Sequence, residues 1–256
     1  MITTKDIDNP LIKFLLHLGD NALIMGHRNS EWCGHGPILE QDIALTNIAL
    51  DQVGQARNFY QYAAELISET KAEQLTEDSL AYLRDSWDFK NCLLAELPNG
   101  DWAQTILKQF IVSAYQYHLY QALANNQNEQ LAAIASKSLK ELNYHLRWSS
   151  DWVLRLGDGT TESKKRMEEA IAILWSYTNE WIDFADYEMI ILGDSHHSIQ
   201  QDWKAKIKSV FDEAGLMIPV DGWMQKGGKV GNHTEHLGYI LTDMQFLQRA
   251  YPNAEW

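Results

Sequence analysis

Acids and histidines in the long helical segments are the residues whose type and spacing bear most directly on chemistry. A carboxylate-bridged di-iron site in a helical bundle takes one carboxylate from each of two helices and a Glu-x-x-His pair from each of the other two. Residues three apart project from the same helix face, which explains that spacing. The nearest candidate pair, Glu141 and His145, is four residues apart. On the inward face the pair three apart is Leu142 and His145, so the carboxylate is missing.

The remaining acids do not complete such a site. Asp20 falls opposite the apolar stripe of its segment, and Asp42 lies nearer the predicted core. Val53 and Ala56 occupy the inward positions of the second segment, and neither binds a metal. We interpret the acids as capped, paired or solvated, and His145 as a hydrogen-bonded core histidine.

A glycine-rich segment at residues 227–238 offers two further kinds of chemistry. Backbone N–H groups before a helix, together with Lys229, are a weak phosphate-binding signal. His233, Glu235 and His236 are metal-ligand types, but their order is not that of a zinc protease. We interpret the segment as a tight turn and a helix start with Thr234 as the cap.

Few helix breakers interrupt the chain, which has 5 prolines and 15 glycines in 256 residues. Apolar residues recur at three- and four-residue steps between them, which predicts helices and no convincing strand. The pattern predicts one helical domain over residues 1–256, an all-α bundle of four long helices with additional C-terminal helices. The predicted helices cover residues 10–25, 38–67, 102–124, 129–156, 163–192, 199–214 and 235–249.

Composition narrows the class of protein. The formal net charge of −14 makes a nucleic-acid partner a poor match. No apolar run approaches the roughly 20 residues that cross a bilayer. The 2 cysteines cannot form a disulfide framework. We therefore expect a cytoplasmic protein without a membrane or nucleic-acid partner.

Several short motifs, in this order and spacing, carry a resemblance that spans nearly the whole chain. They are Leu18-Gly19-Asp20-Asn21, Glu31-Trp32-Cys33-Gly34-His35, Gln55-Ala56-Arg57-Asn58-Phe59, Tyr62-Ala63-Ala64-Glu65, Pro98-Asn99-Gly100, Tyr144-His145-Leu146-Arg147, residues 227–238, Met244-Gln245 and Leu247-Gln248-Arg249. With them the chain resembles the C subunits of the bacterial phenylacetyl-CoA epoxidase, a multicomponent oxygenase of phenylacetate degradation.

The resemblance implies a ferritin-like four-helix bundle and a complex, heterodimeric or larger, with a catalytic A subunit. In that family the A subunit holds the di-iron centre and binds the acyl-CoA. A small B subunit and an NADPH-dependent reductase with flavin and iron–sulfur groups complete the system. The C subunit has no cofactor of its own, so the resemblance implies a non-catalytic structural subunit.

An approximate alignment with the A-type ligand pattern places the six ligand positions of this chain. They fall at Ala22, Val53, Ala56, Ser113, Leu142 and His145, and only His145 keeps a ligand type. Two alternatives stay open. One is a metal-binding ferritin-like oxidase, and the other is an accessory CoA-binding or regulatory module that uses Lys226 and Lys229.

A scaffold subunit needs an interface with its catalytic partner. We expect that interface at the corner of residues 31–37, at the outer faces of the first two helices and along residues 227–249. The candidate interface residues are Glu31, Trp32, His35, Lys229, His233, Glu235 and His236.

Overall fold

The structure is a computed structural model that describes residues 3–4, 7–70, 74–220, 222–251 and 254. Its contacts divide the chain into unit 1, residues 1–98 and 227–256, and unit 2, residues 99–226. Within the described ranges every regular element is a helix or a helical turn, so the predicted all-α fold is confirmed. The single domain over residues 1–256 stays a prediction.

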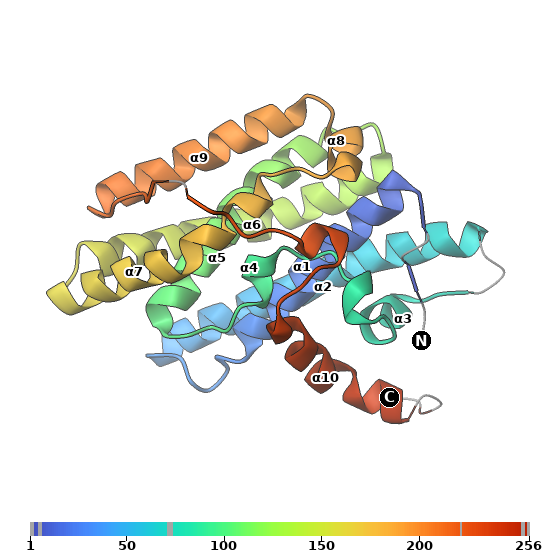
Figure 1. The fold of residues 1–256 in the computed structure, drawn as a ribbon, viewed down its shortest axis with the longest axis horizontal. Coiled ribbons are helices and arrows are strands. Elements are labelled where there is room, and N and C mark those ends of the chain that lie inside the picture. Colours follow the sequence, from blue (N-terminus) through green and yellow to red (C-terminus); the bar gives the residue numbers. More distant parts are fainter. Residues whose placement is uncertain (1–2, 5–6, 71–73, 221, 252–253, 255–256) are drawn as a thin grey trace. The chain divides into compact units, whose positions relative to one another are not determined.

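Unit 1 is built on α1 (Pro10–Ser30) and α2 (Leu39–Thr70), which pack side by side (Figure 1). Asn9 starts α1 as predicted, because its side-chain oxygen accepts hydrogen bonds from the backbone N–H groups of Leu11 and Ile12. The shorter elements are α3 (Glu77–Tyr82), the 3₁₀ turn η1 (Ser86–Asp88), α4 (Leu93–Glu96), the 3₁₀ turn η4 (Gly228–Val230) and α10 (Glu235–Ala250). Of these, α10 packs against α3, η1 and α4.

Unit 2 is built on α5 (Trp102–Leu123) and α6 (Glu129–Gly157), which also pack side by side (Figure 1). α7 (Thr161–Leu174) and α9 (Ser195–Glu213) both contact this pair. Asp101, Asn128 and Thr160 cap the starts of α5, α6 and α7 with side-chain oxygens. The remaining elements are the 3₁₀ turns η2 (Trp175–Tyr177) and η3 (Asn179–Trp181) and the short helix α8 (Asp186–Leu192).

The predicted helix over residues 163–192 is wrong as one element. α7 ends at Leu174, two 3₁₀ turns follow, and α8 begins at Asp186. Thr178 donates a hydrogen bond from Oγ1 to the carbonyl of Trp175, and Glu188 accepts one from the N–H of Ala185. These side chains satisfy backbone groups that a continuous helix would pair, so the chain turns without glycine or proline.

The prediction assigned no element to residues 71–101, where the structure places α3, η1 and α4. Across the described residues, the helices lack the combination of length and apolar character that a membrane span requires.

Candidate functional site

Two of the three predicted ligand positions in unit 1 are buried. Ala22 on α1 and Ala56 on α2 are 0% and 1% exposed, but Val53 on α2 is 41% exposed. The prediction that Val53 faces inward is therefore wrong. The other positions of the predicted stripe are buried, and on this part of α2 the buried pair three residues apart is Gln52 and Gln55.

Glutamine is polar, so a stripe defined by apolar residues passed over both of these positions. Gln52 accepts a hydrogen bond of 2.8 Å at Oε1 from the side-chain amide of Asn29 on α1. Amide groups thus cross-link α1 and α2 in the interior. The Gln-x-x-Gln spacing could have indicated that both glutamines lie on one helix face, because residues three apart share a face.

The three predicted positions in unit 2, Ser113, Leu142 and His145, are all fully buried. Ser113 lies on α5 and accepts a 2.8 Å hydrogen bond at Oγ from the amide of Gln109. Thr105, Gln109, Ser113 and Gln116 follow one another at helical spacing and are all buried. The interior face of α5 therefore carries hydroxyl and amide groups where a metal-binding helix carries carboxylates.

The groups at the six positions do not fit a carboxylate-bridged di-iron centre. They offer alkyl groups, one hydroxyl and one imidazole, and the neighbouring buried residues add neutral amides. Iron pairs of this kind are held and neutralised by carboxylates together with histidines. In the part of the chain that the structure describes, no three His, Cys, Asp or Glu side chains are grouped so that they could hold a metal ion.

Asp20 anchors a buried charged network in unit 1. It is fully buried rather than turned away from the core, which corrects its predicted place opposite the stripe. Its carboxylate accepts hydrogen bonds from the Tyr60 hydroxyl at 2.6 Å, from the backbone N–H of Lys90 at 2.7 Å and from the guanidinium of Arg84. Burial and the nearby Asp20 charge raise the pKa of Tyr60 well above its usual value.

Arg84 supplies the positive charge of this network and is itself fully buried. It also donates to the carbonyls of Leu80 and Asp88, and its guanidinium lies 4.2 Å from the centre of the Phe89 ring. The network thus connects α1 and α2 to residues 80–90, a segment to which the sequence pattern assigned no element. Its groups are paired with one another, so it is structural chemistry rather than an acid–base site.

Glu96 and His233 form a second buried pair in unit 1. His233 Nδ1 lies 2.9 Å from Glu96 Oε2, its Nε2 lies 3.0 Å from the Phe89 carbonyl, and Glu96 also accepts from the N–H of Thr234. Burial alone lowers the pKa of His233, but the hydrogen bond to Glu96 and its charge raise the pKa above its ordinary value. The pair fastens the glycine-rich segment to α4, which ends at Glu96.

The predicted interface residues divide into buried and exposed groups. Lys229 is only 5% exposed and the His233 side chain only 4%, so both lie in the interior of unit 1 and not on its surface. Trp32 and His236 are half-buried, and Glu31, His35 and Glu235 are exposed. Thr234 caps α10 as predicted, because its Oγ1 accepts from the N–H of His236.

An apolar face on the N-terminal half of α2 is the most exposed apolar feature of the helix pair. It consists of Ile38, Leu39, Ile43, Leu50 and Val53, which are 54%, 72%, 51%, 65% and 41% exposed. We call this set the α2 face. Thr46 and Asn47 lie between Ile43 and Leu50 on this helix. Several exposed apolar residues on one helix face are typical of sites that bind other proteins. The α2 face belongs to the outer helix surface where the sequence placed the interface.

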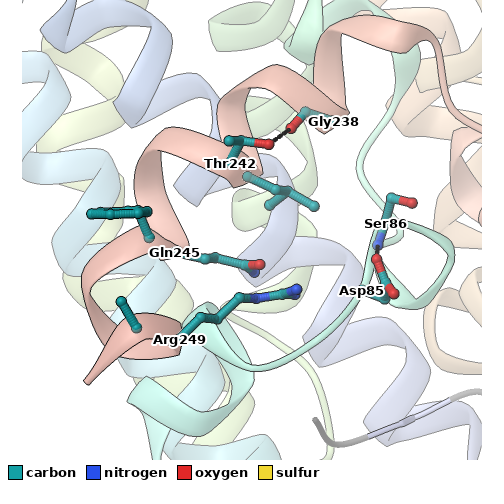
Figure 2. A pocket seen from close by; sticks show the side chains of 9 residues that line it. Asp85, Ser86, Gly238, Thr242, Gln245 and Arg249 are labelled. Carbon is teal, nitrogen blue, oxygen red and sulfur yellow. Dashed lines mark hydrogen bonds between the residues drawn. The ribbon is translucent and has the colours of Figure 1, made fainter. Parts of the chain in front are cut away.

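A groove of about 560 Å³ lies between α10 and the turn at Asp85 and Ser86. Figure 2 shows Thr242, Gln245 and Arg249 along α10 on one side of it and Asp85 with Ser86 on the other. Gln245 and Arg249 donate to the carbonyl of Arg84, which fixes α10 in place. Tyr239, Phe246 and Leu247 of α10 are exposed, and so is Tyr251 directly after it.

The comparison with family models gives one match. The model described as "Phenylacetic acid catabolic protein" matches residues 2–256. The chain belongs to this family. A curated relative is the C subunit of the 1,2-phenylacetyl-CoA epoxidase of Escherichia coli (strain K12), which is 43% identical over 252 residues. The match covers 97% of this chain and 100% of that relative. Membership of the phenylacetic acid catabolic protein family agrees with the all-α fold and with the resemblance that the motifs carried.

Proposed function

We propose that this chain is a non-catalytic structural subunit of a phenylacetyl-CoA epoxidase in aerobic phenylacetate degradation. The observation that carries the proposal is the donor set at the six ligand positions, which lacks every carboxylate that a di-iron centre requires. The 43% identity to the C subunit of such an epoxidase supports the same role. In this proposal the reaction takes place on a catalytic partner, and this chain stabilises the folded structure of that partner by binding to it.

The proposed partner is a di-iron catalytic A subunit, bound through the exposed surfaces of unit 1. The B subunit and a reductase that carries flavin, iron–sulfur groups and NADPH complete the proposed system, which we place in the cytoplasm. The α2 face supports this assignment, because burying it against another chain removes apolar surface from water. The exposed residues Glu31, His35 and Glu235 are proposed to lie at the rim of the same interface.

Reconstitution tests the proposal directly. The chain, the proposed catalytic partner and their co-expressed complex are purified from iron-supplemented cells and washed with a chelator. We expect iron in the complex and in the catalytic partner but not in this chain alone. We also expect epoxidation of phenylacetyl-CoA, with reductase and NADPH, to fall strongly when this chain is left out.

Near-stoichiometric iron retained by the isolated chain would contradict the proposal and would favour the ferritin-like oxidase. Full activity of the catalytic partner without this chain would also contradict it. A variant of the α2 face tests the proposed interface. Leu50→Asp, at a 65% exposed position, is expected to leave the chain folded and to reduce co-purification with the partner.

A further inference from the structure

The helical glycines of unit 1 fall into two groups. A Cβ atom on Gly19 would lie 2.6 Å from Tyr60 Cε1, and one on Gly26 would lie 3.0 Å from Val53 Cγ2, so packing within the chain accounts for both. Gly54 and Gly238 are different. Gly54 lies within α2 and Gly238 within α10, and a Cβ atom at either position would meet nothing within 4 Å. Glycine inside a helix costs stability relative to alanine, and no packing contact among the described residues compensates for it at either position.

Gly54 lies at one end of the α2 face. Leu39, Ile43, Leu50 and Gly54 recur at helical spacing along about 22 Å of α2. Beyond Gly54 the same face becomes polar, because Arg57 and Gln61 both bond to Glu77 of α3. The apolar surface therefore stops where α3 begins to cover the helix, and Gly54 marks that boundary.

We propose that an α-helix of the catalytic partner packs along the α2 face and makes its closest backbone approach at Gly54. This inference rests on the proposed function. The distance between packed helices depends on the side chains at the point of contact, so a glycine permits the closest approach. The backbone groups of α2 are already paired within the helix, which favours a helix as the occupant over an added strand.

The occupant is assigned to a different chain and not to a second copy. Each copy carries a formal net charge of −14, so two copies repel each other as they approach.

Two substitutions at Gly54 separate stability from binding. Gly54→Ala is expected to raise the thermal stability of the isolated chain, since alanine is the better helix former and its methyl group has open space. Gly54→Leu is expected to leave the chain folded but to weaken binding to the catalytic partner by roughly 10- to 100-fold, the effect of overpacking a close contact. Ala172→Leu, at an exposed position of α7 in unit 2, is the matched control and should bind as the wild type does.

The measurements are circular dichroism melting of each variant, titration of the catalytic partner and sedimentation of the chain alone. Wild-type affinity in Gly54→Leu would overturn the inference and leave the proposed function intact. Failure of the wild-type chain to bind the catalytic partner would instead remove the proposed function, and this inference with it. Self-association of the wild type that Gly54→Leu abolishes would also overturn the inference, because the occupant would then be a second copy.

Discussion

Removal of the Asp20 carboxylate is expected to destabilise unit 1 severely. In Asp20→Ala the buried guanidinium of Arg84 loses its counter-charge, and the hydroxyl of Tyr60 and the N–H of Lys90 lose their acceptor. Breaking a buried ion pair by removing one partner costs about 3–5 kcal/mol, because the remaining charge stays buried without compensation. Both side chains are 0% exposed, so water does not screen the loss.

The free energy of unfolding is measured by urea denaturation of the isolated chain, followed by far-UV circular dichroism. Hydrogen exchange of α1 and α2 shows whether the loss falls on unit 1. Arg84→Met is measured beside Asp20→Ala, and the double variant completes a thermodynamic cycle. Since the double variant leaves no unpaired charge, we expect its cost to fall short of the sum of the two single costs by at least about 1 kcal/mol.

Additive costs in this cycle would refute the argument, because they would mean that Asp20 and Arg84 do not stabilise each other's charge. A cost of Asp20→Ala below about 1 kcal/mol would refute it as well, since that is the size expected for an ordinary exposed pair. Lys13→Ala is the surface control. It removes the partner of the fully exposed Asp8 and is expected to leave unfolding unchanged.

Three further predictions follow from the same structure. The pKa of His233 is raised above its ordinary 6.5, so the stabilisation by Glu96 is complete below pH 6.5 and is lost as the pH rises through the folded-state pKa. Thermal melting from pH 5.5 to 8.5 should show this slope in the wild type, and an equal slope in His233→Gln would contradict the assignment. Gly19→Ala should destabilise the chain by about 1–3 kcal/mol in urea, despite the better helix former, because the Tyr60 ring blocks the new methyl group; unchanged stability would show that the ring moves freely. Lys226→Glu should leave the acyl-CoA affinity of the complex unchanged by titration calorimetry, since Lys226 already pairs with Asp183; a tenfold loss would support the CoA-binding alternative.

Patterns within single helices were readable from the sequence. The caps at Asn9 and Thr234 and the long helices α1, α2, α5, α6 and α9 follow from local hydrogen bonding and from apolar residues at helical spacing. The absence of carboxylates at the ligand positions is likewise a property of residue type. It holds whether position 53 or position 52 faces inward, because valine and glutamine both fail as iron ligands.

Tertiary structure decided which polar residues are interior. Asp20 and Arg84 are 64 positions apart, and no periodic pattern in the sequence indicates that the charge of one neutralises the charge of the other. A buried charge requires a partner, and the partner lies in a segment with short elements and weak helical signals. Lys229 and His233 also look like surface residues in the sequence but are buried, and His233 pairs with Glu96, 137 positions away in the chain.

The exposure of the α2 face also depends on tertiary structure. Val53 looks like a core residue in the sequence but is exposed together with Leu39, Ile43 and Leu50, since apolar spacing alone cannot tell which helix faces are covered within one chain. The helical class, the family and the lack of metal ligands at the six positions can be assigned from the sequence, because they depend on residue type and local spacing. The apolar surface that stays exposed is known from the tertiary structure alone, because burial depends on contacts between residues far apart in the chain.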